Sequence, residues 1–183
     1  MLILQKAEIS DASVIAQLVN SAYRGEASRR GWTTEADILD GLRTSTQDVA
    51  KIIKREDAFM LIGTRNNEIV ATICCEWQAI GGSNTAHFGM IAVKPILQNK
   101  GYGKQIIVAA EALTRREWRA VGFTMTVISI RHDVIAFYEK LGYQRTGEFK
   151  DFPVNPELWQ PKVEGLNLQY LAKLVETKQM EIL

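Results

Sequence analysis

The chain has 183 residues, of which 46% are hydrophobic and 23% are charged, and its formal net charge is +1. This composition predicts one soluble globular domain over residues 1–183 and excludes the disordered, collagen-like and coiled-coil classes. A nearly neutral chain also disfavours a nucleic-acid partner, because nucleic-acid-binding domains carry a clustered basic excess. We therefore expect a function on small molecules.

The sequence predicts neither a membrane segment nor a metal site. No apolar run approaches the roughly 20 residues that cross a bilayer, and the N-terminus lacks the pattern of a secretory signal, so we expect a cytoplasmic protein with no membrane partner. Cys74 and Cys75 are adjacent, and strand neighbours point to opposite faces, which predicts two buried reduced thiols. Two histidines without metal-ligand spacing predict no metal.

The first part of the chain predicts a strand, a helix and a polar loop. Residues 2–9 are typical of a short strand, and Ser10 and Asp11 form a helix cap before apolar residues at helical spacing. Residues 24–34 are polar and contain glycine, which indicates a loop. Trp32 in this loop either folds back onto the core or contacts a ligand.

Two short helices and three strands are predicted next. They are helices over residues 35–42 and 47–54 and strands over residues 58–65, 68–77 and 85–93. Asn66 and Asn67 tolerate the positive φ of a two-residue hairpin turn, so the first two of these strands should be antiparallel.

The second half of the chain alternates strands with amphipathic helices. We expect a helix ending near Arg119, a strand over residues 123–129, a helix over residues 133–141, and strands over residues 143–149 and 166–172. Three prolines precede the last strand, in a connection that we expect to be a loop within the domain. This order predicts a mixed sheet with helices on its faces.

Residues 98–104, Gln-Asn-Lys-Gly-Tyr-Gly-Lys, lie between a strand and a helix, where exposed backbone amides commonly bind anions. A Walker loop would need glycine at position 98 and Ser or Thr at position 105, and the chain has glutamine at both. A dinucleotide fingerprint would need a small residue in place of Ile106 and an acidic residue roughly 20 positions on, which is missing. Both of these phosphate-binding motifs are therefore excluded.

The remaining pattern is Gln/Arg-x-x-Gly-x-Gly after a strand that ends Val-x-Pro, and it resembles motif A of the GNAT superfamily of N-acetyltransferases. Residues 136–143, Ala-Phe-Tyr-Glu-Lys-Leu-Gly-Tyr, resemble the second signature of that superfamily. Residues 31–37 and 145–153 also resemble one branch of this superfamily, but this resemblance does not identify the acceptor.

In element order the resemblance covers roughly residues 2–174. It implies an α/β (α+β) fold with a mixed, largely antiparallel central sheet of six to seven strands flanked by helices. It also implies transfer of an acetyl group from acetyl-CoA to a primary amine by direct attack in a ternary complex. A non-catalytic acyl-CoA sensor or interaction module on the same fold is the alternative, and a monomer and a homodimer are both compatible with the sequence.

The resemblance also implies which residues hold the cosubstrate. The backbone of Ile91, Ala92 and Val93 would face the acetyl oxygen and pantetheine, and the pyrophosphate would lie on Gln98, Asn99, Lys100, Gly101, Tyr102, Gly103 and Lys104. Lysines at a helix N-terminus oppose the helix dipole, so their presence is better explained by a bound anion.

Tyr138 matches the superfamily tyrosine that faces the coenzyme sulfur, where a protonated hydroxyl can act as a general acid. It could also be a core tyrosine of the apolar stripe. Arg131 stands where many members have Asn. For the general base, His87 is one candidate and Glu76, acting directly or through water, is the other. An acetyl-cysteine intermediate is disfavoured because no histidine is near either thiol in sequence.

The acceptor amine is expected between residues 24–43 and the loop 151–165, with Trp32 and Glu35 as substrate-binding candidates. Acidic Glu35 and Asp37 would suit a cationic amine, although acidic residues at a helix start are also ordinary caps.

Overall fold

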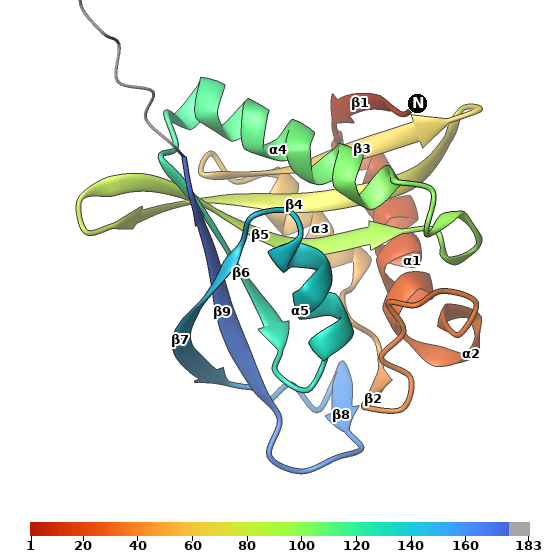
Figure 1. Ribbon diagram of the computed structural model, residues 1–183. Helices are drawn as coiled ribbons and strands as arrows, with labels where there is room; N and C mark the ends of the chain where they lie inside the picture. Colours follow the sequence, from red (N-terminus) through yellow and green to blue (C-terminus); the bar gives the residue numbers. More distant parts are fainter. Residues whose placement is uncertain (176–183) are drawn as a thin grey trace, which may run out of the picture.

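The computed structural model describes residues 1–175 and contains a seven-stranded sheet with the strand order β1-β3-β4-β5-β6-β9-β7 (Figure 1). These strands are β1 (Ile3–Lys6), β3 (Ala58–Arg65), β4 (Glu68–Ile80), β5 (Ser83–Val93), β6 (Gly122–Ile128), β7 (Gln144–Asp151) and β9 (Asn167–Leu174). Of the paired neighbours in residues 1–175, β5 and β6 are parallel and the others are antiparallel. The predicted mixed, largely antiparallel sheet with flanking helices is confirmed.

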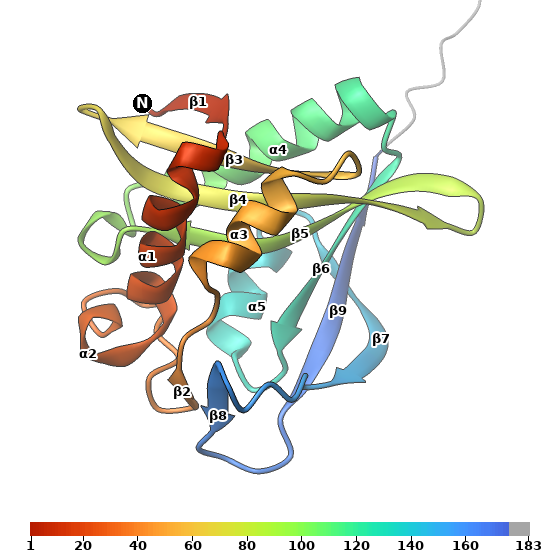
Figure 2. The ribbon, with the colours of Figure 1, turned by 180° about the vertical axis from the view of Figure 1, so that it is seen from behind.

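Helices cover both faces of the sheet. The helices are α1 (Ala12–Tyr23), α2 (Gly25–Ser28), α3 (Thr46–Ile53), α4 (Tyr102–Trp118) and α5 (His132–Glu139), with 3-10 turns η1 (Ile9–Asp11) and η2 (Pro95–Leu97). Helices α4 and α5 lie on the face that Figure 1 presents, and α1 and α3 lie on the face seen in Figure 2. No helix within residues 1–175 is long and apolar enough to cross a membrane.

The two faces have separate hydrophobic cores, and the cysteines show the alternation between them. Cys75 belongs to the core under α4 and α5, whereas Cys74 belongs to the core under α1 and α3. Both are buried free thiols, as predicted. The predicted hairpin turn is also confirmed, because Asn66 and Asn67 have φ values of 50° and 60°.

The helix predicted over residues 35–42 is wrong. Residues 39–41 instead form strand β2 (Leu39–Gly41), which pairs antiparallel with β8 (Trp159–Pro161) in a second, two-stranded sheet (Figure 1). Gly41 has φ 86°, and an added Cβ would lie 2.1 Å from the carbonyl oxygen of Leu158. Glycine thus permits the close approach that joins the segment 24–43 to the loop 151–165.

Strand β5 contains a bulge at Met90, which has φ 45°. The β4–β5 register shifts at this point, so Ile91 packs on the α4 core while Ala92 belongs to the α1 core. His87 lies between Ala86 and Phe88, both on the α4 side, and therefore faces the other side of the sheet. In a regular strand His87 and Ile91, four residues apart, would point to the same face. The bulge at Met90 adds a residue between them, so they point to opposite faces.

Candidate active site

The site opens where β5 and β6 separate. Their parallel pairing runs from Thr85 and Gly122 to Phe88 and Met125. Beyond that point β6 continues along β9 while β5 continues along β4 to Val93. A cavity of about 700 Å³ lies between the separated strands and is lined by residues of both. This volume is enough for a substantial organic ligand.

One end of the cavity is the N-terminus of α4. Gly101 is the N-cap residue with φ 80°, a conformation that favours glycine, and an added Cβ there would meet no atom within 4 Å. The Gln105 N–H donates to the Gly101 carbonyl at 3.0 Å, so the preceding amides of the first turn have no carbonyl one turn back. Open space beside unpaired amides at the positive end of a helix dipole fits a diphosphate.

Most of the predicted cofactor residues line this cavity. Those that do are Ile91, Val93, Gln98, Asn99, Gly101, Tyr102, Gly103 and Lys104. Ala92 is fully buried in the α1 core, and Lys100 is exposed and does not line the cavity. Of the two lysines, Lys104 therefore has the better position for an anion.

The side chain of Gln98 contacts the segment of residues 31–33 and does not extend to the start of α4. Its Oε1 accepts the Trp32 N–H at 2.8 Å, and its Nε2 donates to Thr33 Oγ1 at 2.8 Å and to the Val93 carbonyl at 3.1 Å. An added Cβ at Gly31 would lie 2.6 Å from the same Oε1. Gln98 thus positions the loop 31–33, a role that the motif alone does not indicate.

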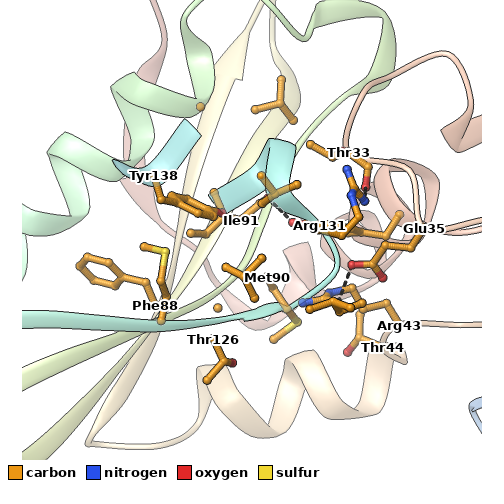
Figure 3. A pocket seen from close by; sticks show the side chains of 18 of the residues that line it. Thr33, Glu35, Arg43, Thr44, Phe88, Met90, Ile91, Thr126, Arg131 and Tyr138 are labelled. Carbon is orange, nitrogen blue, oxygen red and sulfur yellow. Dashed lines mark hydrogen bonds and ion pairs between the residues drawn. The ribbon is translucent and has the colours of Figure 1, made fainter. Parts of the chain in front are cut away.

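Tyr138 of α5 lines the cavity and is 7% exposed. Its ring makes edge contacts with Phe137 and Tyr143, at centroid distances of 5.2 Å and 6.1 Å. Burial raises the pKa of its hydroxyl well above the ordinary value, and the nearby cations Arg43 and Arg131 only partly oppose this shift. The hydroxyl is therefore protonated at any physiological pH. Figure 3 shows Tyr138 among the side chains that line the cavity.

The two candidates for the general base lie on adjacent strands but differ in access to the cavity. Glu76 and His87 are directly opposite each other in the β4–β5 register. Glu76 lines the cavity and pairs with Arg55 at 2.5 Å, whereas His87 is not among the lining residues. The Nδ1 of His87 is 2.9 Å from Thr124 Oγ1, and burial lowers the pKa of the imidazole.

Arg131 holds the loop before Glu35. Its guanidinium donates to the carbonyls of Trp32 at 2.8 Å, Thr34 at 2.6 Å and Thr33 at 3.3 Å, and it pairs with Asp133. The residue that stands in place of the usual Asn therefore binds this chain's own backbone.

The other end of the cavity contains a buried ion cluster. Glu35 is 6% exposed and pairs with Arg24, itself 5% exposed, and with Arg43 at 3.5 Å. The Arg43 guanidinium lies over the Tyr23 ring, 4.4 Å from its centroid. Burial and the neighbouring Arg43 lower the pKa of Arg24, although its pair with Glu35 opposes this. Sequence reasoning identified Glu35 and missed both arginines.

Tyr23 and Trp32 complete this end of the cavity. The Tyr23 hydroxyl donates to the Ile91 carbonyl at 2.5 Å, next to the bulge of β5. Trp32 lines the cavity and makes an edge contact with Phe137 at 5.4 Å, so the two alternatives for Trp32, packing and ligand contact, are compatible. Within residues 1–175 no group of three or more His, Cys, Asp and Glu side chains could hold a metal.

Solved structures with this fold come from several bacteria. A Streptococcus mutans protein, smu.2055, superposes with a TM-score of 0.70 at 16% identity, covering 95% of this chain and 99% of its own. The Salmonella typhimurium yncA, a putative acetyltransferase solved with acetyl-CoA, gives 0.70 at 16% identity and coverages of 97% and 96%. The Escherichia coli ribosomal-protein-S18-alanine N-acetyltransferase gives 0.65 at 16% identity and coverages of 100% and 99%.

A search of curated proteins found no match. The model of the acetyltransferase (GNAT) family, in contrast, matches residues 16–143, which run from α1 through α4 to the residue before β7. That range contains the Gly101 helix start and Tyr138. The chain therefore belongs to the GNAT acetyltransferase family.

Proposed function

We propose that this protein transfers the acetyl group of acetyl-CoA to a primary amine by direct attack in a ternary complex. The observation that carries the proposal is the continuity of one cavity, which joins the amides at the start of α4 to Tyr138 and to the buried cluster around Glu35. An anion-binding end, a proton donor and a separate acceptor end are the parts that acyl transfer needs.

The chain's residues fit the coenzyme at the α4 end of the cavity. The first-turn amides from Gly101 to Lys104 would bind the pyrophosphate, reinforced by the helix dipole and by the Lys104 charge. The β5 backbone near Ile91 would lie beside the pantetheine arm in the wedge between β5 and β6. When bound, acetyl-CoA supplies an acetyl group activated as a thioester.

Two side chains would donate and accept the protons of the reaction. The Tyr138 hydroxyl holds a proton in the buried part of the cavity and can donate it to a leaving thiolate. The Glu76 carboxylate lines the same cavity and can accept a proton from the acceptor's ammonium group, directly or through water, which leaves a neutral amine to attack the thioester. We favour Glu76 over His87 because Glu76 alone of the two lines the cavity.

Release of free coenzyme A thiol, measured with a panel of amines, tests the proposal. The variant Tyr138→Phe keeps the ring and its aromatic contacts, so we expect an unchanged melting temperature and unchanged stabilisation by acetyl-CoA. Its kcat should fall about 100-fold, the scale of general acid catalysis. Normal folding and coenzyme binding together with an unchanged kcat would show that Tyr138 is not the acid.

The same assay separates the enzyme from the sensor. Coenzyme-induced thermal stabilisation without thiol release on any amine would favour a non-catalytic acyl-CoA-binding protein.

A further inference from the structure

The charges at the acceptor end of the cavity do not balance. Arg24 and Arg43 share a single carboxylate, that of Glu35. The other charged side chains near this part of the wall have partners outside the cluster: Arg131 pairs with Asp133, Asp48 with Lys51, and Glu76 with Arg55, which also pairs with Asp57. Within the Arg24–Glu35–Arg43 cluster itself, one positive charge is thus left without a carboxylate, and unpaired buried charges are costly.

The two arginines also have unused hydrogen-bond donors. The Nε of Arg24 and the Nε of Arg43 are buried and have no hydrogen-bond partner among the described residues. Both arginines line the cavity, and the Arg24 side chain is 4% exposed. Buried polar groups in folded proteins are nearly always paired, so donors left open in a cavity wall indicate a missing acceptor.

The cluster is close to the proposed chemistry. Figure 3 shows Arg43 and Glu35 on one side of the cavity and Tyr138 on the other, with Met90 and Ile91 between them. Arg43, Glu35 and Tyr138 all line this one cavity. A small molecule held by Arg43 could therefore extend toward the Tyr138 hydroxyl.

We infer that the acceptor amine also carries a carboxylate, as an amino acid does, and that this carboxylate binds Arg43 and the open donors of the Arg24–Glu35–Arg43 cluster. The inference rests on the proposed acetyl transfer. Arginine is the side chain best suited to this ligand, because its planar fork matches both oxygens of a carboxylate. A monoanion also matches the single surplus charge, whereas a phosphate dianion would exceed it.

This inference reverses the charge expected from the sequence. Glu35 was a candidate for binding a cationic amine, but its carboxylate is already shared by two arginines. Asp37 forms a two-bond pair with Arg29 and is exposed outside the cavity lining. A polyamine would therefore bring further cations to a cluster in which two arginines already share one carboxylate.

Matched acceptors test the inference by thiol release. For each L-amino acid we would compare the free acid, its amide and the amine that lacks the carboxylate, for example L-leucine, L-leucinamide and isoamylamine. We expect kcat/KM to be at least 10-fold higher for the acid in the preferred series, the scale of a charge-assisted contact. Turnover of the amides or amines at an equal or higher rate would overturn the inference and leave acetyl transfer intact.

A binding experiment decides the case without turnover. Calorimetric titration of the same amino acids into wild-type protein saturated with coenzyme A should detect binding, and Arg43→Gln should weaken it at least 10-fold. Arg29→Gln is the matched control, because Arg29 pairs with Asp37 on the surface of the neighbouring segment. If Arg43→Gln does not fold, Arg43→Lys keeps the charge but loses the fork, and should still weaken binding.

The two proposals fail in different ways. If only the acetyl-transfer proposal is wrong, amino acids will bind in a way that depends on Arg43, but no acceptor will give thiol release. Absence of amino-acid binding to the wild-type protein, or equal binding to Arg43→Gln, would overturn the carboxylate site.

Discussion

The contact between Gly31 and Gln98 gives a test of the site's architecture that does not depend on activity. An added Cβ at Gly31 would lie 2.6 to 2.7 Å from the three terminal atoms of the Gln98 side chain. Since a carbon cannot approach so closely, the variant Gly31→Ala must displace the Gln98 amide. The displaced amide would lose its bonds with Trp32, Thr33 and Val93.

The size of the effect follows from those bonds. Each partly buried hydrogen bond contributes about 1 kcal/mol net. Displacing the amide should therefore lower the free energy of unfolding by about 2 to 3 kcal/mol. Gln98→Ala removes the same bonds and should cost a similar amount. In the double variant the clash is gone, so Gly31→Ala should add little to Gln98→Ala, which gives a coupling of about 2 kcal/mol.

Denaturation with urea measures all four proteins, with the free energy of unfolding extrapolated to water. Gly89→Ala is the control, because an added Cβ there meets no atom within 4 Å and the variant should unfold much like the wild type. Additive costs of Gly31→Ala and Gln98→Ala would refute the reasoning, since they would mean that the new methyl group does not act through Gln98.

Two further predictions concern protons. Glu76→Gln should lower kcat/KM about 100-fold, the scale of general base catalysis, while His87→Gln should leave it near the wild-type value, as steady-state kinetics would show; the opposite pattern would make His87 the base. The hydrogen bond from Arg131 lowers the pKa of Asp133 below its usual 3.8, so this pair stabilises the fold above that pH and is lost as the pH falls through the lowered value. Asp133→Asn lacks this titrating group, so its free energy of unfolding, measured by urea denaturation, should fall less between pH 7 and pH 3 than that of the wild type. An equal fall in both proteins would contradict this.

Local patterns predicted those parts of the protein that depend on neighbouring residues. The Asn66-Asn67 hairpin, the opposite faces of Cys74 and Cys75, and the glycine start of α4 at Gly101 all follow from local backbone preferences. The proposed anion-binding end of the cavity could be predicted for the same reason, because it consists of backbone amides.

The acceptor end depends on partners distant in the sequence. Strand β2 pairs with β8, more than 100 residues later, so the local helical pattern of residues 35–42 was overridden by tertiary pairing. Arg131 binds carbonyls 97 to 99 residues away. The bulge of β5 could have been predicted from the sequence, because a glycine inside a strand, here Gly89, often indicates a bulge.

Gln98 and Arg131 show why the two family signatures also organise the acceptor end. Gln98 precedes the glycines of the first signature and binds the amide of Trp32, while Arg131 precedes the helix of the second and binds the carbonyl of the same residue. The loop that leads to Glu35 is thus held from both sides by residues adjacent to the proposed coenzyme site. Because Glu35 in turn pairs with Arg24 and Arg43, the position of the proposed acceptor cluster depends on Gln98 and Arg131, one residue from each signature region.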